Sequence, residues 1–148
     1  MPPKPFSLDT VLKVRKRKED LAQQKLQQAM AAQKKIETKL LATRLNQQQV
    51  IQTLETKQQE GMLAVELARF EERITYAHSE IKSLQKLLHE KTKICENKRN
   101  ILIEKSRDYK VLLELKERQN KAWKQYLDKK EANMLDEIAI LHHDRRVD

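Results

Sequence analysis

Residues that break helices are almost absent from this 148-residue sequence, and their positions constrain the fold more than any motif does. The prolines Pro2, Pro3 and Pro5 all fall at the very start of the chain, and the one glycine, Gly61, is interior. An ordinary globular domain of this length needs many turns, which draw on Gly, Pro, Asn and Asp. Helix formers, namely Lys, Glu, Gln, Leu and Ala, dominate the rest. The sequence therefore predicts an all-α fold without an ordinary compact core.

Apolar residues recur at alternating steps of four and three through the first part of the chain, which is the pattern of a coiled-coil seam. Nine of the fourteen positions in this series are apolar, although the stretch 43–47 is polar. Because Ser7 or Asp9 can cap a helix, we predict a first helix over about residues 7–57. The seam positions are Leu8, Leu12, Arg15, Glu19, Ala22, Leu26, Ala29, Gln33, Ile36, Leu40, Thr43, Gln47, Val50 and Leu54.

A second series of the same kind follows Gly61 and is more regular. It predicts a second helix over about residues 63–141. Its first eight positions are all apolar: Leu63, Leu67, Phe70, Ile74, Ala77, Ile81, Leu84 and Leu88. Lysines enter the later positions, which are Lys91, Cys95, Lys98, Leu102, Lys105, Tyr109, Leu112, Lys116, Gln119, Trp123 and Tyr126.

Gly61 lies among polar residues between the two series, and a lone glycine there favours a helix–helix turn, over about 58–62. One uninterrupted helix through Gly61 is the alternative. A reversal makes the chain an antiparallel two-helix coiled coil, a helical hairpin with a longer second helix. We expect 1–148 to form a single elongated domain with flexible termini. The antiparallel partners would be Leu54 with Leu67, Leu40 with Ile81, and Leu12 with Tyr109.

The unequal helix lengths predict that the second helix lacks partner residues beyond roughly Leu115. An isolated helix with exposed aromatic side chains is poorly stabilised, so we expect this segment to bind another protein. Folding back and fraying are the alternatives. The segment carries Trp123, Tyr126, Leu127, Met134, Leu135, Ile138 and Leu141.

The net charge of +9 arises from mixed charges, with 31 basic and 22 acidic residues often spaced as on a solvated helix face. The densest basic run, residues 13–18, also suits an acidic partner such as a protein, anionic lipid headgroups or nucleic acid. A basic-zipper helix is disfavoured because Glu19 and Asp20 follow this run directly. We therefore expect no nucleic-acid partner and leave peripheral membrane association open.

Motifs for catalysis, cofactor binding and metal binding are missing from the sequence. It has no phosphate-binding glycine loop, no GxSxG or HExxH motif, and no cysteine pair, so we expect no enzyme and no cofactor. His142 and His143 are adjacent, which points them to different sides of a helix. Cys95 lies in the seam, where a small buried apolar residue is the ordinary role. With no apolar stretch of membrane-spanning length and no secretory signal, a cytoplasmic location is the default.

Three sparse signatures occur in order along the chain: Phe6-Ser7-Leu8 with Leu12, Arg15 and Glu19; Phe70-x3-Ile74-x2-Ala77; and Leu135-Asp136-Glu137-x-Ala139 with Arg145 and Arg146. Together they resemble the FliJ family, the small coiled-coil component of the flagellar type III export apparatus. The resemblance implies a non-enzymatic stalk or adaptor, similar to the rotor-stalk helices of F-type ATPases. A stalk of a virulence type III secretion system, or a generic coiled-coil scaffold, is the alternative.

The resemblance also implies partners and a location. FliJ proteins associate with the hexameric export ATPase and promote assembly of its ring. They link the ring to the large membrane protein of the export gate, and they are linked to recycling of export chaperones. The implied location is the cytoplasm, with peripheral attachment to the cell membrane at the flagellar base.

Two surfaces are expected to bind these partners. By resemblance, the face of Phe70, Ile74, Ala77 and Ile81 matches the family's surface toward the gate, yet by spacing the same residues are the best core positions in the chain. Both roles stay open from the sequence. The free termini are the expected ATPase-contacting end, where basic residues would meet an acidic ring lumen. The candidates there are Lys13, Arg15, Arg17, Lys121, Trp123, Lys124, Asp136 and Glu137.

Overall fold

The computed structural model describes residues 3–147, and all regular structure in that range is helical. Helix α1 spans Asp9–Glu60 and helix α2 spans Ala64–Val147, with 52 and 84 residues. The two helices pack against each other as a hairpin with a longer second helix, which confirms the predicted all-α fold class. The helix ends differ from those predicted, because α1 continues through residues 58–60 and α2 continues past residue 141.

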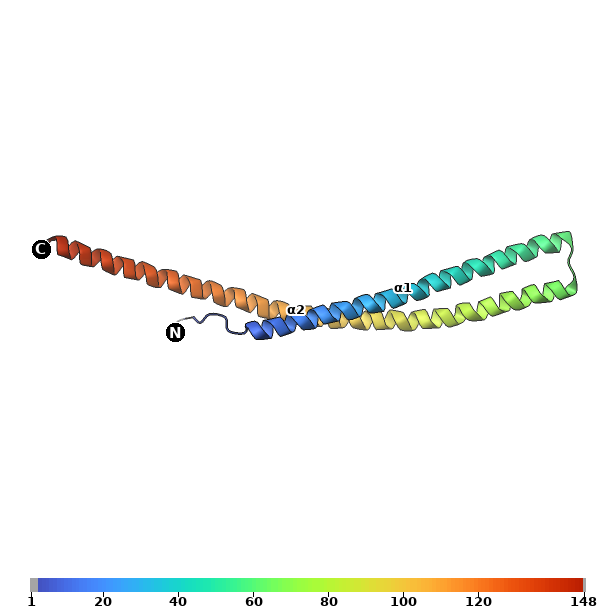
Figure 1. The fold of residues 1–148 in the computed structure, drawn as a ribbon, viewed down its shortest axis with the longest axis horizontal. Coiled ribbons are helices and arrows are strands. Elements are labelled where there is room, and N and C mark those ends of the chain that lie inside the picture. Colours follow the sequence, from blue (N-terminus) through green and yellow to red (C-terminus); the bar gives the residue numbers. More distant parts are fainter. Residues whose placement is uncertain (1–2, 148) are drawn as a thin grey trace. The chain divides into compact units, whose positions relative to one another are not determined.

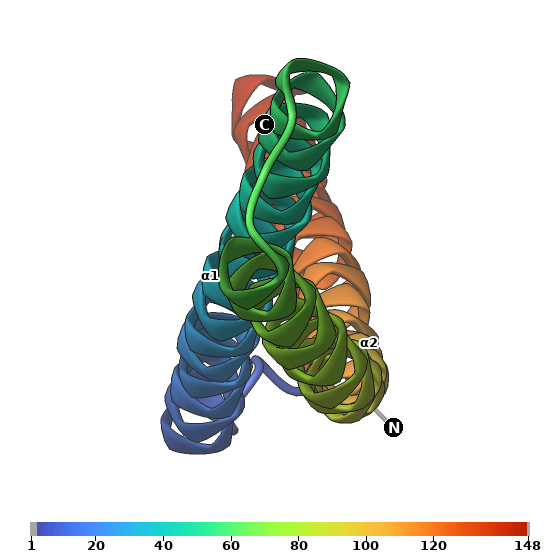
Figure 2. The ribbon, with the colours of Figure 1, turned by 90° about the vertical axis from the view of Figure 1, so that its right-hand side faces the viewer.

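The connection between the helices consists of residues 61–63 (Figure 2). Gly61 has a φ of +92°, a backbone conformation that side chains with a Cβ atom rarely adopt. Its N–H donates to the Gln58 carbonyl at 3.4 Å, so one of the last free carbonyls of α1 gains a partner. The Leu67 N–H donates to the Leu63 carbonyl at 3.1 Å and begins the ladder of α2. One glycine therefore ends the first helix and permits the next.

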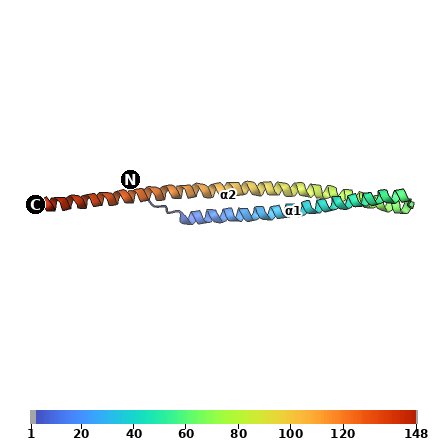
Figure 3. The same cartoon turned by 90° about the horizontal axis from the view of Figure 1, so that it is seen from above.

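The chain divides into two compact units, which we describe separately. Unit 1 combines Met1–Asp20 with Ile103–Asp148, and unit 2 is Leu21–Leu102. In unit 2, the two helices run antiparallel and side by side (Figures 1 and 3). A cluster of Leu40, Ile81 and Leu84 forms its core, and Ile36 and Leu88 pack against it. The contact of Leu40 with Ile81 matches the predicted antiparallel register.

In unit 1, the start of α1 packs against α2 through Phe6, Leu12 and Leu112, with Tyr109 and Leu113 around them. Leu12 and Tyr109 are again a predicted pair. Phe6 precedes α1 and is nevertheless buried, because the extended segment before the helix lies against α2 (Figure 3). The short core of this unit therefore draws one of its three buried residues from outside the helices.

The seam series agrees closely with the burial of each side chain. Every seam position from Leu12 to Leu54 in α1, and from Leu67 to Tyr126 in α2, is buried or half-buried. Leu8 and Leu63, the first positions of the two series, are exposed. Leu41 and Leu45, which lie off the frame, are also exposed. Within the described residues, neither helix has a segment long and apolar enough to cross a membrane.

Candidate partner-binding surfaces

The predicted gate-facing residues lie in the seam of unit 2. Phe70 is 9% exposed, and Ala77 and Ile81 are each 7% exposed, while Ile74 is half-buried. They occupy successive seam positions because steps of four and three keep them on the side of α2 that faces α1. In this arrangement the four side chains contribute mainly to packing between the helices. Little of their surface remains open to a partner.

Polar and charged groups border this part of the seam. The Lys57 ammonium lies 5.2 Å from the centre of the Phe70 ring, and the Arg73 guanidinium lies 5.7 Å from it. Such contacts stabilise a cation over an aromatic face and cover the ring with a charged rim. The Gln47 amide donates to the Ile74 carbonyl at 3.4 Å, so a polar seam residue finds a partner on the opposite helix.

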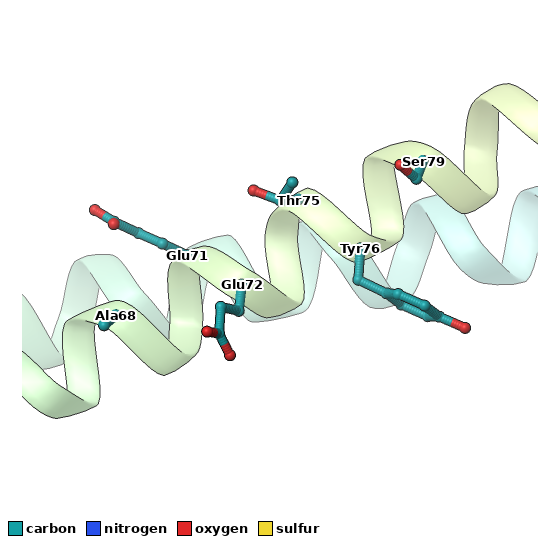
Figure 4. Close-up of a pocket in the computed structure, with 6 residues that line it drawn as sticks. All are labelled: Ala68, Glu71, Glu72, Thr75, Tyr76 and Ser79. Atoms are coloured by element: carbon teal, nitrogen blue, oxygen red, sulfur yellow. The ribbon is translucent and has the colours of Figure 1, made fainter.

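The outer side of the same segment forms a second surface, which we call the Tyr76 face. A shallow hollow on α2 is lined by Ala68, Glu71, Glu72, Thr75, Tyr76 and Ser79 (Figure 4). Glu71 and Thr75 project to one side of the helix, whereas Glu72 and Tyr76 project to the other. Tyr76 is 72% exposed, and it also borders a hollow that reaches Val50 and Ala77. An exposed tyrosine ring is a side chain that protein–protein contacts favour.

Sequence reasoning overlooked the Tyr76 face because it concentrated on the apolar seam. A signal was present: aromatic residues make up only 4% of the chain, and Tyr76 stands two positions after the seam residue Ile74, outside the frame. An aromatic residue off the frame of a coiled coil is predicted to be exposed. Tyr76 lies between Ile74 and Ala77, within the segment for which the family resemblance predicts a contact with the gate.

The second predicted surface lies in unit 1, where two contacts tie the start of α1 to α2. The Arg15 guanidinium donates a hydrogen bond of 2.8 Å to the Asp108 carbonyl. The Lys116 ammonium lies 3.3 Å from the Asp9 carboxylate and 5.9 Å from the centre of the Phe6 ring. Since Asp9 is the first residue of α1, Lys116 is close to the last residue of α2 that has an α1 residue opposite it.

Lys16 is engaged within α1 and against α2. Its ammonium is 3.0 Å from the Glu19 carboxylate and 3.5 Å from that of Asp20, one turn along the helix. It also lies 5.1 Å from the centre of the Tyr109 ring. The hydrogen bond that Lys16 donates to Glu19, together with the negative charge of that carboxylate, raises the pKa of Lys16 above its ordinary value. This part of the basic run is therefore partly neutralised by its own helix.

The candidate ATPase-contacting residues have different environments. Arg15 is half-buried and bound to α2, so its role in the structure is to join the helices. Trp123 is half-buried and stacks on Tyr126, with ring centres 5.6 Å apart. The pair Asp136 and Glu137 lies roughly 20 Å farther along α2, at 1.5 Å per residue. The exposed members of the set are Lys13, Arg17, Lys121, Lys124, Asp136 and Glu137.

We call residues 117–147 of α2 the terminal arm. Every side chain from Leu127 to Arg146 is exposed, including Met134 and Ile138. No folding back of these side chains onto another helix occurs. Among the described residues, no group of three His, Cys, Asp or Glu side chains is placed to hold a metal ion, and this includes the surroundings of His142.

Comparison with known proteins places the chain in one family. The family model described as "Flagellar FliJ protein" matches residues 3–148, which is essentially the whole chain. No curated protein and no solved structure shows significant similarity to this chain.

Proposed function

Because the chain belongs to the flagellar FliJ protein family and is therefore a component of the flagellar export apparatus, we propose that it is the stalk that binds the export ATPase ring and couples it to the export gate. The family is one of non-catalytic structural or adaptor proteins. The family match along residues 3–148 is the observation that carries this proposal. In it the ATPase supplies the chemistry, and this chain needs no cofactor.

The proposed contact with the ATPase uses the free end of unit 1. Four exposed cations, Lys13, Arg17, Lys121 and Lys124, are available to meet an acidic ring lumen. Arg15 supports this end indirectly, since its bond to Asp108 holds α1 against α2. We assign Trp123 to the same contact as its aromatic anchor. Asp136 and Glu137, farther along the arm, would contact basic groups of the ring.

The proposed contact with the membrane protein of the gate uses the segment around Phe70. Four seam residues have two roles in this proposal. They pack on α1, and they thereby position the surface that the gate protein contacts. These residues are Phe70, Ile74, Ala77 and Ile81. The adjoining Tyr76 face supplies the accessible side chains. The exposed Tyr76 ring supports this assignment, because a few residues, tyrosine prominent among them, contribute most of the binding energy of a protein contact.

The remaining parts of the proposal concern chaperones and location. Export chaperones would bind this chain as cargo is handed to the gate. The protein would act in the cytoplasm and be held peripherally at the cell membrane at the flagellar base. Attachment there would come through its protein partners.

The test is ATP hydrolysis by the cognate export ATPase with and without this chain. We expect stimulation of hydrolysis and larger ATPase oligomers, and we expect Lys121→Glu with Lys124→Glu to reduce both several-fold. The matched control is Lys82→Glu with Lys86→Glu, which changes two exposed lysines of the same helix in unit 2. Unchanged hydrolysis and unchanged oligomers with the native chain would overturn the proposal. Equal loss in both double variants would overturn only the assignment to the terminal arm.

A further inference from the structure

An apolar stripe runs along the terminal arm without any covering helix in unit 1. Leu127, Met134, Ile138 and Leu141 follow one another at steps of seven, four and three, which keeps them on one side of the helix. All four are exposed, and Ile138 and Leu141 line a shallow hollow. Glu131 occupies the missing position of the frame. This is the seam of a coiled coil that has only one of its helices.

Between Glu117 at the start of the arm and Arg145 and Arg146 near its end, the charged residues form two blocks of opposite sign. Residues 118–130 contain five basic residues and one acidic residue, a net charge of +4. Residues 131–144 contain four acidic residues and no Lys or Arg, a net charge of −4 with neutral histidines. The basic residues are Arg118, Lys121, Lys124, Lys129 and Lys130, and the acidic ones of the second half are Glu131, Asp136, Glu137 and Asp144.

We propose that this stripe is covered by the terminal arm of a second copy of the chain, in antiparallel orientation. Antiparallel pairing places the basic half of each arm against the acidic half of the other. Parallel pairing would place basic against basic and acidic against acidic, which is unfavourable. A partner helix of another protein would not require the arm to carry two blocks of equal and opposite net charge and nearly equal length. A second copy with two-fold symmetry uses both of them at once.

The stripe also defines a register for the pair. The seam of a coiled coil alternates between two kinds of position. In an antiparallel pair, each kind on one helix faces the other kind on the partner helix. Ile138 of one copy then lies opposite Leu127 of the other, and the two-fold axis passes between residues 132 and 133. Lys130 and Glu137 lie two turns apart on one flank of the stripe. In this register, Lys130 of each copy faces Glu137 of the other copy at the edge of the seam.

In this register the Leu127–Ile138 contacts supply the apolar burial, Met134 lies opposite Glu131 and Leu141 lies opposite Lys124. The charges of the two blocks select the orientation. Flanking ion pairs contribute little free energy and are screened by salt. We therefore expect a dimer whose population depends on protein concentration. The arm also carries Lys121, Trp123, Lys124, Asp136 and Glu137 of the proposed ATPase contact, so a self-paired arm would be unable to bind the ring. The inference itself rests on the arm alone and does not depend on that contact.

The first test is sedimentation equilibrium of the full chain over a range of concentrations. We expect a monomer–dimer equilibrium that Ile138→Asp abolishes. The matched control is Ile140→Asp, because Ile138 and Ile140 are 49% and 61% exposed but lie on opposite sides of the helix. A chain that stays monomeric at every concentration would overturn the proposal, as would a dimer that both variants weaken equally.

The second test is a charge exchange. Lys130→Glu alone and Glu137→Lys alone should each weaken the dimer several-fold, because each sets like charges opposite each other. An equimolar mixture of the two single variants should dimerise again, and so should the chain that carries both changes. Failure of both combinations to recover would contradict the antiparallel register.

Orientation is tested by disulfide formation in chains where Cys95→Ala removes the native thiol. Leu127→Cys and Ile138→Cys variants, mixed under oxidising conditions, should form predominantly the mixed disulfide. Predominant formation of the two identical-chain disulfides would show parallel pairing and would overturn the proposal.

Discussion

The Gln33 side-chain amide crosses the seam of unit 2 and donates a hydrogen bond of 3.0 Å to the Thr92 hydroxyl. The same hydroxyl donates to the Leu88 carbonyl at 2.8 Å, so the acceptor is held in place by its own helix. Both residues are half-buried, and Ile36 and Leu88 pack nearby. A polar pair that is satisfied only in one alignment favours that alignment, at some cost in stability.

Replacing Gln33 with Leu should therefore raise the stability of the chain. The substitution exchanges a half-buried polar seam residue for an apolar one, and we expect the free energy of unfolding in urea to rise by about 1 kcal/mol. Thr92 loses its partner but keeps its bond to Leu88. The control is Gln48→Leu, an exposed position on α1 that should change stability little. A lower free energy for the seam variant would show that the polar pair itself stabilises the fold.

Phe70 and Tyr76 separate packing from partner binding. Phe70→Ala removes a nearly buried ring from the seam and should lower the free energy of unfolding by about 3 kcal/mol. Tyr76→Ala should leave it within about 0.5 kcal/mol, because the ring is mostly exposed. Denaturant unfolding of both variants measures this difference.

Binding of the same two variants to the gate protein tests the proposed surface. Tyr76→Ala should weaken binding while the chain stays folded. The opposite result would be normal binding by Tyr76→Ala, together with a Phe70→Ala variant that keeps the native denaturation midpoint yet loses binding. That result would mean that the gate protein contacts the Phe70 ring directly.

The sequence was sufficient to predict the fold class and the seam, because burial between two helices imposes a period that survives even where the seam residue is polar. Gln33, Thr43 and Gln47 break the apolar pattern but stand in frame, and all three are half-buried. The frame could not predict Phe6, whose burial depends on where an extended segment meets α2. It also could not predict that Arg15 bonds to the Asp108 carbonyl, since helix periodicity places side chains but does not assign their partners.

Gly61 should be the most sensitive position of the connection. With φ at +92°, a Cβ atom is strained there even though it would meet no atom within 4 Å. We expect Gly61→Ala to lower the free energy of unfolding by about 1 kcal/mol, and Gly61→Asn to cost less because Asn tolerates positive φ better. Thermal unfolding followed by circular dichroism measures both. Equal effects of Ala and Asn would indicate that lost flexibility, and not strain at this φ, determines the cost.

Removing the terminal arm should separate folding from function. A chain that ends at Gln119 keeps Lys116, its contact with Asp9, and the cluster of Phe6, Leu12 and Leu112. Every side chain from residue 127 to 146 is exposed, and only Ala122, Trp123 and Tyr126 among the other described residues that are removed are half-buried. The truncation therefore removes little buried surface, and the melting temperature should fall by only a few degrees. Stimulation of the ATPase should be lost with the arm. The control is a chain ending at residue 143, which retains the apolar stripe and should keep both properties. A collapse of helicity in the shorter chain would mean that the arm supports the hairpin, and that its side chains are not exposed as the structure places them.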